Sequence, residues 1–359
     1  MSTSDPLNLN RSSHIVIVYL MASPRSGFAI VTPASRGIGF ALARYLLQHT
    51  DLPIIATARR NFDNLRNRLL CGMENSAAEQ RLSVFDVDVT EEPTVRSLAD
   101  DIRQTHPKAP LRLALTVPGI LHVEKSPSQI DAHAALESLK VNTIGPMLLM
   151  KHLTPFLPTR SSPLFDPFDG EVKLPQHAIY AMMAARVGSV SDNRMGGWYS
   201  YRASKAAVFQ LAKTLDLYLE GKCADRAISL AMHPGTVKTD FTKSYQDGRE
   251  MLSAEESAER LCGVLDMIKT YYASVYQLCV VLGEGLPRWT AIFSSGAHFV
   301  FYLQTLLHIP RHIHHDGIFR SMQVQVPPVS PQALHNEVGH QRDAFRILRP
   351  RNYVFGVEA

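Results

Sequence analysis

The sequence predicts an α/β fold in which one parallel sheet is covered by helices on both faces. Short apolar runs of strand length alternate along the chain with longer segments that repeat apolar residues at helical spacing. Such alternation is typical of β-α-β units, whose strands are buried on both faces. The chain has 359 residues, which is enough for one large domain with additional segments.

The expected elements follow one another between residues 28 and 282. The first strand, Phe28–Thr32, is an unbroken apolar run, and a helix over 40–48 follows the turn after it. Ser253-Ala254-Glu255-Glu256 is typical of a capped helix start with acidic residues in its first turn. We expect the other strands at 53–58, 82–87, 111–116, 178–183, 227–232 and 275–282, and the other helices from 91, over 136–156, over 201–219 and from 253.

A turn with two glycines, at residues 33–39, separates the first strand from its helix. Gly37 and Gly39 would let the backbone and a phosphate group come close together. The start of a helix adds free backbone N–H groups and the positive end of the helix dipole. The turn is therefore a candidate phosphate-binding site.

Tyr201 and Lys205 are four residues apart in an expected helix, so their side chains share a face. A phenol has a reference pKa near 10, and an ammonium fixed beside it favours the phenolate. A downward shift of three units would need roughly 4 kcal/mol of differential stabilisation. The pair predicts a general acid or base, although exposed helices also produce this spacing by chance.

Together these segments resemble the short-chain dehydrogenase/reductase family, which has Thr-Gly-x-x-x-Gly-x-Gly followed by Tyr-x-x-x-Lys. Asp88-Val89-Thr90, Asn142 and the loop 233–240 match further motifs of that family in the expected order. Residues 188–200 look most like its C-factor and sniffer branch. The resemblance covers residues 27–267 and implies a Rossmann-type doubly wound parallel sheet in a single domain, 27–288, with an extra C-terminal segment.

The resemblance implies hydride transfer between NADP and a small carbonyl or alcohol. Tyr201 would be the general acid or base, and Lys205 would lower its pKa and bind the nicotinamide ribose. Asn142 would hold a helix kink and a water, with a hydrogen bond inside the helix as the alternative. Turn capping is the alternative for Asp88 and Thr239. The family's cofactor contacts fall on Thr32, Ser35, Arg36, Gly37, Ile38, Gly39, Arg59, Asp88, Val89, Gly119, Tyr201, Lys205, Pro234, Gly235, Val237 and Thr239.

The end of the second strand favours NADP over NAD. Thr57-Ala58-Arg59-Arg60 offers two bases and no acid, and Arg36 in the glycine turn adds a third base. An acid there would bind the ribose 2′-hydroxyl, whereas a guanidinium binds a 2′-phosphate through parallel hydrogen bonds. For one of the two neighbouring arginines, a solvated loop charge is the alternative.

Three positions depart from the family pattern. Pro33 replaces the first glycine of the turn and removes one N–H donor, and Thr116 begins the segment where the family has an asparagine. Ala185, preceded by Ala184, stands where the family has its catalytic serine, and Ser189 is the nearest residue that could supply that hydroxyl. Without it, Tyr201 would have to donate its proton with no partner polarising the carbonyl. These departures leave a second hypothesis open, an NADP-binding signalling or scaffold protein with weak or no catalysis.

Composition narrows the class of protein further. The net charge of +4 is mild and the basic residues are scattered, so a nucleic-acid partner is not expected. The four cysteines form no C-x-x-C pair, which favours free thiols in a reducing, cytoplasmic compartment. No metal site is expected, because the cluster His308, His312, His314 and His315 fits a polar tail better than an ordered ligand set.

The two ends of the chain differ from the middle. Residues 1–26 are expected to be a disordered leader, with Met21 as an alternative start. Residues 289–359 form the extra segment, and 289–307 carry no formal charge. That stretch is a poor spanning helix but fits an interfacial helix with peripheral membrane contact, or packing on the domain or on a partner subunit of a homo-oligomer.

Overall fold

The computed structural model describes residues 26–73, 76–167, 171–245, 251–268, 278–281, 290–293 and 300–302. All of them belong to the first of two compact units, Met1–Thr305. The expected leader before residue 26 and the histidine cluster after residue 307 lie outside the described residues.

One sheet organises the described residues, with the strand order β3-β2-β1-β4-β5-β6-β7-β8-β9. The pairs from β3 to β7 are parallel, and β8 and β9 continue the sheet antiparallel. This order reverses direction between β1 and β4, as in doubly wound Rossmann-type folds, and confirms the predicted fold class. The strands are β1 Phe28–Thr32, β2 Ile54–Ala58, β3 Leu82–Asp86, β4 Leu111–Thr116, β5 Ala178–Met183, β6 Ala227–His233, β7 Leu278–Val281, β8 Thr290–Phe293 and β9 Val300–Tyr302.

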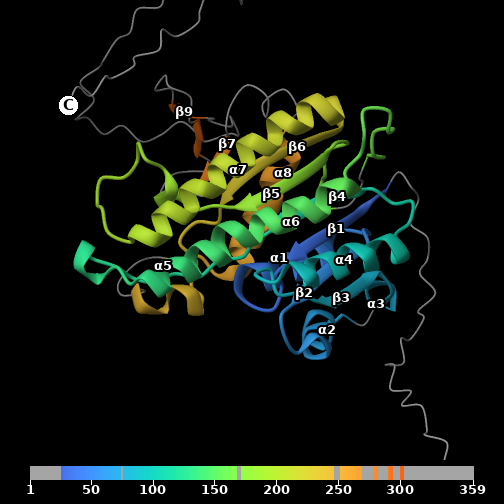
Figure 1. Cartoon of the computed structure of the whole chain (residues 1–359). Coiled ribbons are helices and arrows are strands. Elements are labelled where there is room, and N and C mark those ends of the chain that lie inside the picture. The colour runs from blue at the N-terminus through green and yellow to red at the C-terminus, as the bar shows by residue number, and fades with distance from the viewer. Residues whose placement is uncertain are drawn as a thin grey trace, which may run out of the picture. The chain divides into compact units, whose positions relative to one another are not determined.

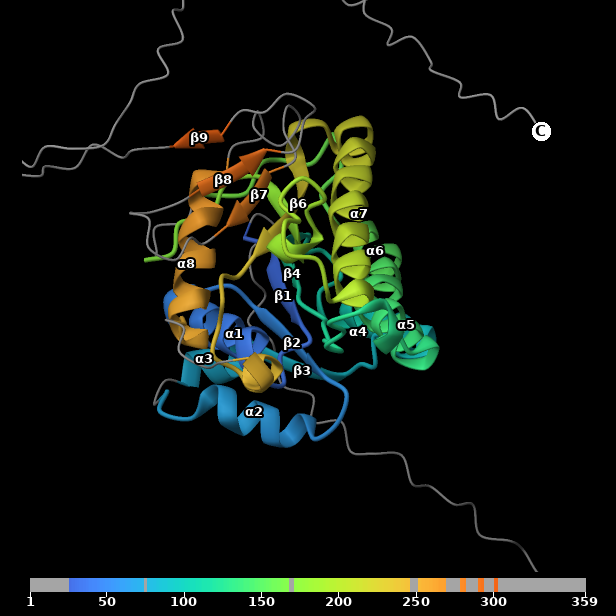
Figure 2. The ribbon, with the colours of Figure 1, turned by 90° about the vertical axis from the view of Figure 1, so that its left-hand side faces the viewer.

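Helices cover both faces of the sheet (Figures 1 and 2). On one face lie α1 (Gly37–His49), α2 (Phe62–Leu70), α3 (Ser76–Arg81) and α8 (Ala254–Met267). On the other face lie α4 (Glu92–Thr105), α5 (Ala132–Leu139), α6 (Gly145–Leu153) and α7 (Tyr199–Cys223).

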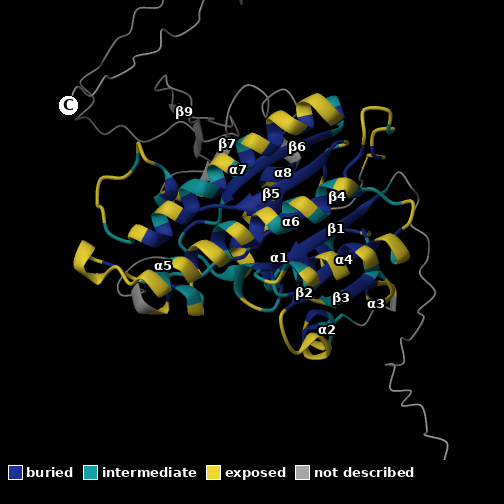
Figure 3. Ribbon diagram, viewed as in Figure 1, coloured by how far each residue is buried: buried dark blue, intermediate teal, exposed yellow. Residues whose placement is uncertain are grey.

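Alternate residues of each strand pack on opposite faces of the sheet. In β2, Ile54 and Ala56 join the core under α1 and α8, whereas Ile55 joins the core under α4, α6 and α7. Nearly all residues of β1, β2, β4, β5 and β6 are therefore buried, as Figure 3 shows, which explains why these strands are mostly apolar. The predicted bounds of β4 and β5 agree with the structure residue for residue.

The helix predicted over 136–156 is not continuous. Two α-helical pieces, α5 and α6, are joined by a π-helical segment, Lys140–Ile144, and a short 3₁₀ segment ends the run. The apolar periodicity of the sequence indicated the helix correctly. The periodicity did not reveal the extra residue in the π-helical turn. This turn contains Asn142, whose contacts are with distant parts of the chain and leave no local pattern.

The apolar stretch 289–307 forms strands where the structure describes it, at 290–293 and 300–302, so the expected interfacial helix is wrong for these residues. Ile292, Phe293, Val300, Phe301 and Tyr302 are β-branched or aromatic, and such residues favour strands. Of the helices described, none is long and apolar enough to cross a membrane.

Candidate active site

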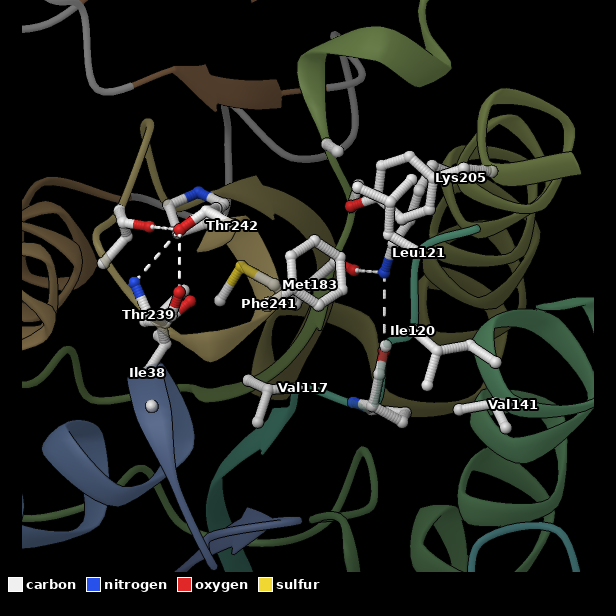
Figure 4. A pocket seen from close by; sticks show the side chains of 18 of the residues that line it. Ile38, Val117, Ile120, Leu121, Val141, Met183, Lys205, Thr239, Phe241 and Thr242 are labelled. Carbon is white, nitrogen blue, oxygen red and sulfur yellow. Dashed lines mark hydrogen bonds between the residues drawn. The ribbon is translucent and has the colours of Figure 1, made fainter. Parts of the chain in front are cut away.

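A cleft of about 1060 Å³ lies at the carboxyl ends of the central strands, where the strand order reverses. Ligands bind at this place in doubly wound sheets. Figure 4 shows part of it, with Lys205 on one side, Phe241 in the middle, and Ile38 with Thr239 on the other side. The sequence-predicted site residues that line it are Ser35, Arg36, Gly37, Ile38, Gly39, Arg59, Asp88, Val89, Gly119, Tyr201, Lys205, Pro234, Gly235, Val237 and Thr239.

The turn after β1 is tightly folded and requires its second glycine. A Cβ atom on Gly39 would lie 2.1 Å from the backbone oxygen of Pro33, which is far inside van der Waals contact. Gly37, the first residue of α1, has φ +55°, in the region that favours glycine. The first turn of α1 therefore faces the cleft with its backbone, as a phosphate-binding turn needs.

Lys205 is buried in α7, with 3% of its surface exposed. Its Nζ donates hydrogen bonds to the backbone oxygens of Met183 (2.8 Å) and Pro118 (3.4 Å), at the ends of β5 and β4. Burial lowers the pKa of Lys205 to about 8, which still leaves the ammonium charged at neutral pH. The two carbonyls therefore hold a cation at the floor of the cleft.

The phenol ring of Tyr201 lies one helical turn from this cation. The Nζ atom of Lys205 is 5.8 Å from the centre of the ring, and Tyr201 is 7% exposed. Trp198 packs edge-on at 6.2 Å between ring centroids and Phe241 at 5.7 Å. The aromatic contacts and the cation together fix the ring at the wall of the cleft, where the predicted acid or base would have to be.

Asn142 lies in the π-helical segment and is fully buried. Its amide accepts a hydrogen bond from Ile120 N (2.8 Å) and donates to Ile120 O (2.9 Å) and Ser204 Oγ (3.0 Å). Ser204 Oγ in turn donates to the backbone oxygen of Tyr201 at 2.8 Å. Asn142 thus links the loop after β4 to α7. It does not line the cleft, and its predicted water stays a prediction.

Arg59 and Asp88 lie together at the far end of the cleft. Arg59 Nη1 is 3.8 Å from Asp88 Oδ2, and the arginine side chain is 65% exposed. Asp88 Oδ1 also accepts from the backbone N–H and the hydroxyl of Thr90, at 2.9 and 2.7 Å. Burial alone would raise the pKa of Asp88, but these hydrogen bonds and the Arg59 charge lower it on balance. Asp88 thus caps the turn and also lines the cleft.

Thr242 makes two of the hydrogen bonds that hold the loop after β6. Thr242 Oγ1 accepts from the Thr239 backbone N–H (3.0 Å) and lies 2.7 Å from the backbone oxygen of Val237, to which it donates. Gly235 has φ +83°, so this position also favours glycine. The loop therefore presents its backbone to the cleft in a fixed conformation.

Besides Asn142, two of the predicted site residues lie outside the cleft lining. Thr32 is buried beneath the cleft and accepts a hydrogen bond from the Thr57 hydroxyl at 2.7 Å. Ser189 does not line the cleft, because its hydroxyl lies within a turn, 3.3 Å from the Asp192 backbone N–H, which donates to it. Its catalytic role stays a prediction. Ala184 and Ala185, at the position of the missing serine, do line the cleft.

Other residues of the cleft were not singled out from the sequence. Arg186 and His233 line it near Lys205, and Trp198 flanks Tyr201. His233 could have been suspected, because it ends β6 at the carboxyl edge of the sheet, where functional side chains gather. Arg186 and Trp198 had no comparable signal, since they lie in the irregular segments around 186–198.

A Rossmann-type sheet with a Tyr/Lys pair in the cleft at its carboxyl edge is typical of dinucleotide-binding oxidoreductases. The sequence profile of the short chain dehydrogenase family matches residues 27–163. The chain therefore matches the short-chain dehydrogenase/reductase family over residues 27–163, in agreement with the resemblance of its motifs.

The similar proteins share the family but differ in what their names report. A 1-hydroxy-2-glutathionyl-2-methyl-3-butene dehydrogenase of Rhodococcus sp. (strain AD45) is 27% identical over 66% of this chain and 89% of its own length. Carbonyl reductase (NADPH) 3 of Homo sapiens is 26% identical over 65% of this chain and 88% of its own. The structure of the carbonyl reductase Sniffer of D. melanogaster has a TM-score of 0.59 at 22% identity, covering 71% of this chain and 96% of that one, and shows the same fold.

Proposed function

We propose that this protein is an NADP-dependent reductase or dehydrogenase that acts on small carbonyl or alcohol substrates. The observation that carries the proposal is the buried Lys205 ammonium beside the Tyr201 ring in the cleft. A buried cation is costly, and Lys205 has no carboxylate within ion-pair distance among the described residues. A catalytic phenolate that needs the charge would explain why it is kept.

The proton chemistry of this proposal belongs to Tyr201. In the reducing direction its hydroxyl gives a proton to the substrate oxygen, and the phenolate that remains is stabilised by Lys205. Met183 O and Pro118 O hold the ammonium in place for this role. Asn142 and Ser204 would keep the start of α7 at the loop after β4.

The residues at the other end of the cleft fit a dinucleotide. When bound, NADPH supplies the hydride. The turn 33–39 would hold its pyrophosphate, Asp88 and Val89 its adenine, and the loop 234–239 its nicotinamide amide. The first turn of α1 has the close-packed glycine backbone that a phosphate needs, which supports this assignment.

Arg59 and Arg36 support NADP as the cofactor. Both line the cleft. The guanidinium of Arg59 is exposed, so it can donate hydrogen bonds to a 2′-phosphate in addition to its contact with Asp88. The name of the human relative, carbonyl reductase (NADPH) 3, includes NADPH. A fold neighbour, the carbonyl reductase from chicken fatty liver, has NADPH bound in its crystal structure, which has a TM-score of 0.57 at 22% identity over 72% of this chain and 96% of that one.

A direct test separates the enzyme from the alternative, an NADP-binding signalling or scaffold protein. Purified protein is titrated with NADPH by fluorescence, and NADPH oxidation is then followed with a panel of aldehydes, ketones and quinones. The proposal expects binding and turnover with part of the panel. Binding without turnover on any of these substrates would favour the alternative.

We also propose a homo-oligomer. Leu136, Leu139, Ile144 and Met147 are exposed apolar side chains on α5, the π-helical segment and α6, and Leu136 is 66% exposed. Large apolar side chains that gather on one surface indicate an interface. Light scattering of the purified chain measures its mass and so tests this proposal.

A further inference from the structure

The cleft lacks the hydroxyl that should polarise a substrate carbonyl. Negative charge develops on the carbonyl oxygen during reduction, and fixed hydrogen-bond donors at that place stabilise it. Ala184 and Ala185 line the cleft at the end of β5 and carry no donor in their side chains. The hydroxyl of Ser189 lies in the following turn, with Ser191 Oγ at 3.2 Å.

His233 is the side chain beside this gap. Met183 pairs in register with Met232, and Ala184 N donates to Met232 O at 2.8 Å, so the next residues, Ala184 and His233, are neighbours across the two strand ends. Ala184 and Ala231 pack in the core beneath α7. Because side chains alternate along a strand, His233 leaves β6 on the same face as Ala231, which is the face of Tyr201 and Lys205.

The imidazole of His233 has no hydrogen-bond partner among the described residues. Its Nδ1 is buried without a partner. Its Nε2 is not among the buried unpartnered atoms, and His233 lines the cleft. Buried polar atoms are nearly always satisfied, so an imidazole left in this state at a cleft indicates a partner that the chain does not itself supply.

The ring is neutral at physiological pH. Burial lowers the pKa of His233 to about 4, and the nearby charges of Arg186 and Lys205 lower it further. A neutral imidazole carries one N–H, and a buried N–H without an acceptor is rarer than a buried lone pair without a donor. The tautomer with the proton on Nε2 is therefore favoured, and its N–H is the one on the accessible side of the ring. A neutral histidine that polarises a carbonyl has a precedent in triosephosphate isomerase.

We propose that His233 donates a hydrogen bond from Nε2 to the substrate carbonyl oxygen, in place of the missing serine hydroxyl and beside the Tyr201 hydroxyl. The inference rests on the proposed reductase function. The hydride of NADPH forms the new C–H bond, the carbonyl π-electrons move to oxygen, and Tyr201 supplies the proton. His233 keeps its own proton throughout, so it acts as a donor that stabilises charge and not as an acid.

The test compares two replacements of His233 in the full-length protein. His233→Leu removes the donor at similar bulk, and His233→Gln restores an N–H at a similar reach. With NADPH and a series of para-substituted benzaldehydes, we expect His233→Leu to lower turnover by about 10²–10³-fold, the usual loss for one such donor. We expect His233→Gln to recover most of it, and both variants to bind NADPH as the wild type does.

A spectroscopic measurement tests the contact itself. With benzaldehyde bound in the presence of NADP⁺, the infrared carbonyl stretch should lie at higher frequency in His233→Leu than in the wild type, because the hydrogen bond is lost. The stretch in His233→Gln should return toward the wild-type value. If His233→Leu does not fold, both measurements are made on His233→Met instead, which also lacks the donor.

Three other results would each contradict either the role of His233 or the proposed reductase function. Turnover of His233→Leu within threefold of the wild type, with an unchanged carbonyl stretch, would overturn the inference alone. Ser189→Ala is measured alongside, and a large loss there with none at position 233 would assign the role to the serine. A wild-type protein that binds NADPH but reduces no carbonyl would refute the proposed function, and the inference with it.

Discussion

The carboxylate of Glu124 accepts hydrogen bonds from both the backbone N–H (2.7 Å) and the hydroxyl of Ser200, the residue that precedes Tyr201. Glu124 is 2% exposed, and its backbone oxygen accepts from Trp198 N at 2.6 Å. A carboxylate at the start of a helix is also favoured by the helix dipole. Glu124 therefore fixes the loop after β4 to the first turn of α7, and so positions the phenol.

We predict that Glu124→Ala lowers the free energy of unfolding by about 1–3 kcal/mol, because it leaves the N–H and hydroxyl of Ser200 buried without a partner. It should also lower kcat while NADPH affinity stays the same. Urea unfolding and steady-state kinetics measure both. Glu79→Gln, at an exposed carboxylate, is the matched control, and equal effects in the two variants would remove Glu124 from this role.

Replacing Tyr201 by Phe should abolish NADPH oxidation and leave NADPH affinity nearly unchanged, since only the hydroxyl is removed and the ring contacts with Trp198 and Phe241 remain. Tyr199→Phe removes a hydroxyl from an exposed ring two residues earlier and should stay near wild-type turnover. Turnover of Tyr201→Phe within twofold of the wild type would show that another group transfers the proton.

Arg59→Ala should weaken NADPH binding by about 1.5–3 kcal/mol, the range for hydrogen bonds to charged groups, and should hardly change NADH binding. The physical reason is that only NADPH carries the 2′-phosphate. Arg60→Ala is the control, because Arg60 is exposed and does not line the cleft. Equal losses for NADPH and NADH in fluorescence titrations would mean that Arg59 shapes the loop and does not recognise the phosphate.

The buried Lys205 predicts a pH dependence of stability. Its pKa falls from 10.5 to about 8 on folding, so the unfolded chain binds more protons between these values. The resulting destabilisation is fully present below pH 8 and disappears as the pH rises toward 10.5. At neutral pH it is on the order of 3 kcal/mol.

Lys205→Met should therefore unfold at a higher urea concentration than the wild type at pH 7, with the difference shrinking between pH 8 and 10. It should also lack turnover. A difference that stays constant over this pH range would show that the lysine is not the group that titrates.

Replacement by alanine should change the stability of the protein in opposite directions at two glycines that differ in their surroundings. Gly39→Ala should cost about 1–3 kcal/mol, as overpacking does, and should weaken NADPH binding, because its Cβ would meet Pro33 O. Gly263→Ala, in α8 with nothing near the added Cβ, should stabilise by about 0.5–1 kcal/mol. Thermal unfolding with and without NADPH measures both, and equal destabilisation would contradict the packing of the turn.

The parallel sheet could be predicted from the sequence because its strands are buried on both faces and are therefore continuously apolar. β1 and β5 are the clearest examples. The Tyr201–Lys205 pair and the turn 33–39 were predictable because each is contained in one short segment.

The contacts of Glu124 and His233 were not predictable in this way. Glu124 meets Ser200 across 76 positions of the chain, and His233 lies beside Ala184 only because β5 and β6 pair in one register. No local pattern encodes either relationship. The placement of Ser189 outside the cleft likewise depends on a turn closed by its own neighbours.

The number of residues in the π-helical segment Lys140–Ile144 determines where Asn142 lies relative to the site. A π-turn holds one residue more than an α-turn, and one residue turns a helix by about 100°. A deletion of one residue here would leave an unbroken α-helix that keeps its apolar composition. It would nevertheless rotate α5 against α6 and withdraw the Asn142 amide from Ile120 and Ser204. Among relatives of this chain, insertions and deletions in this segment should therefore be selected against more strongly than most substitutions.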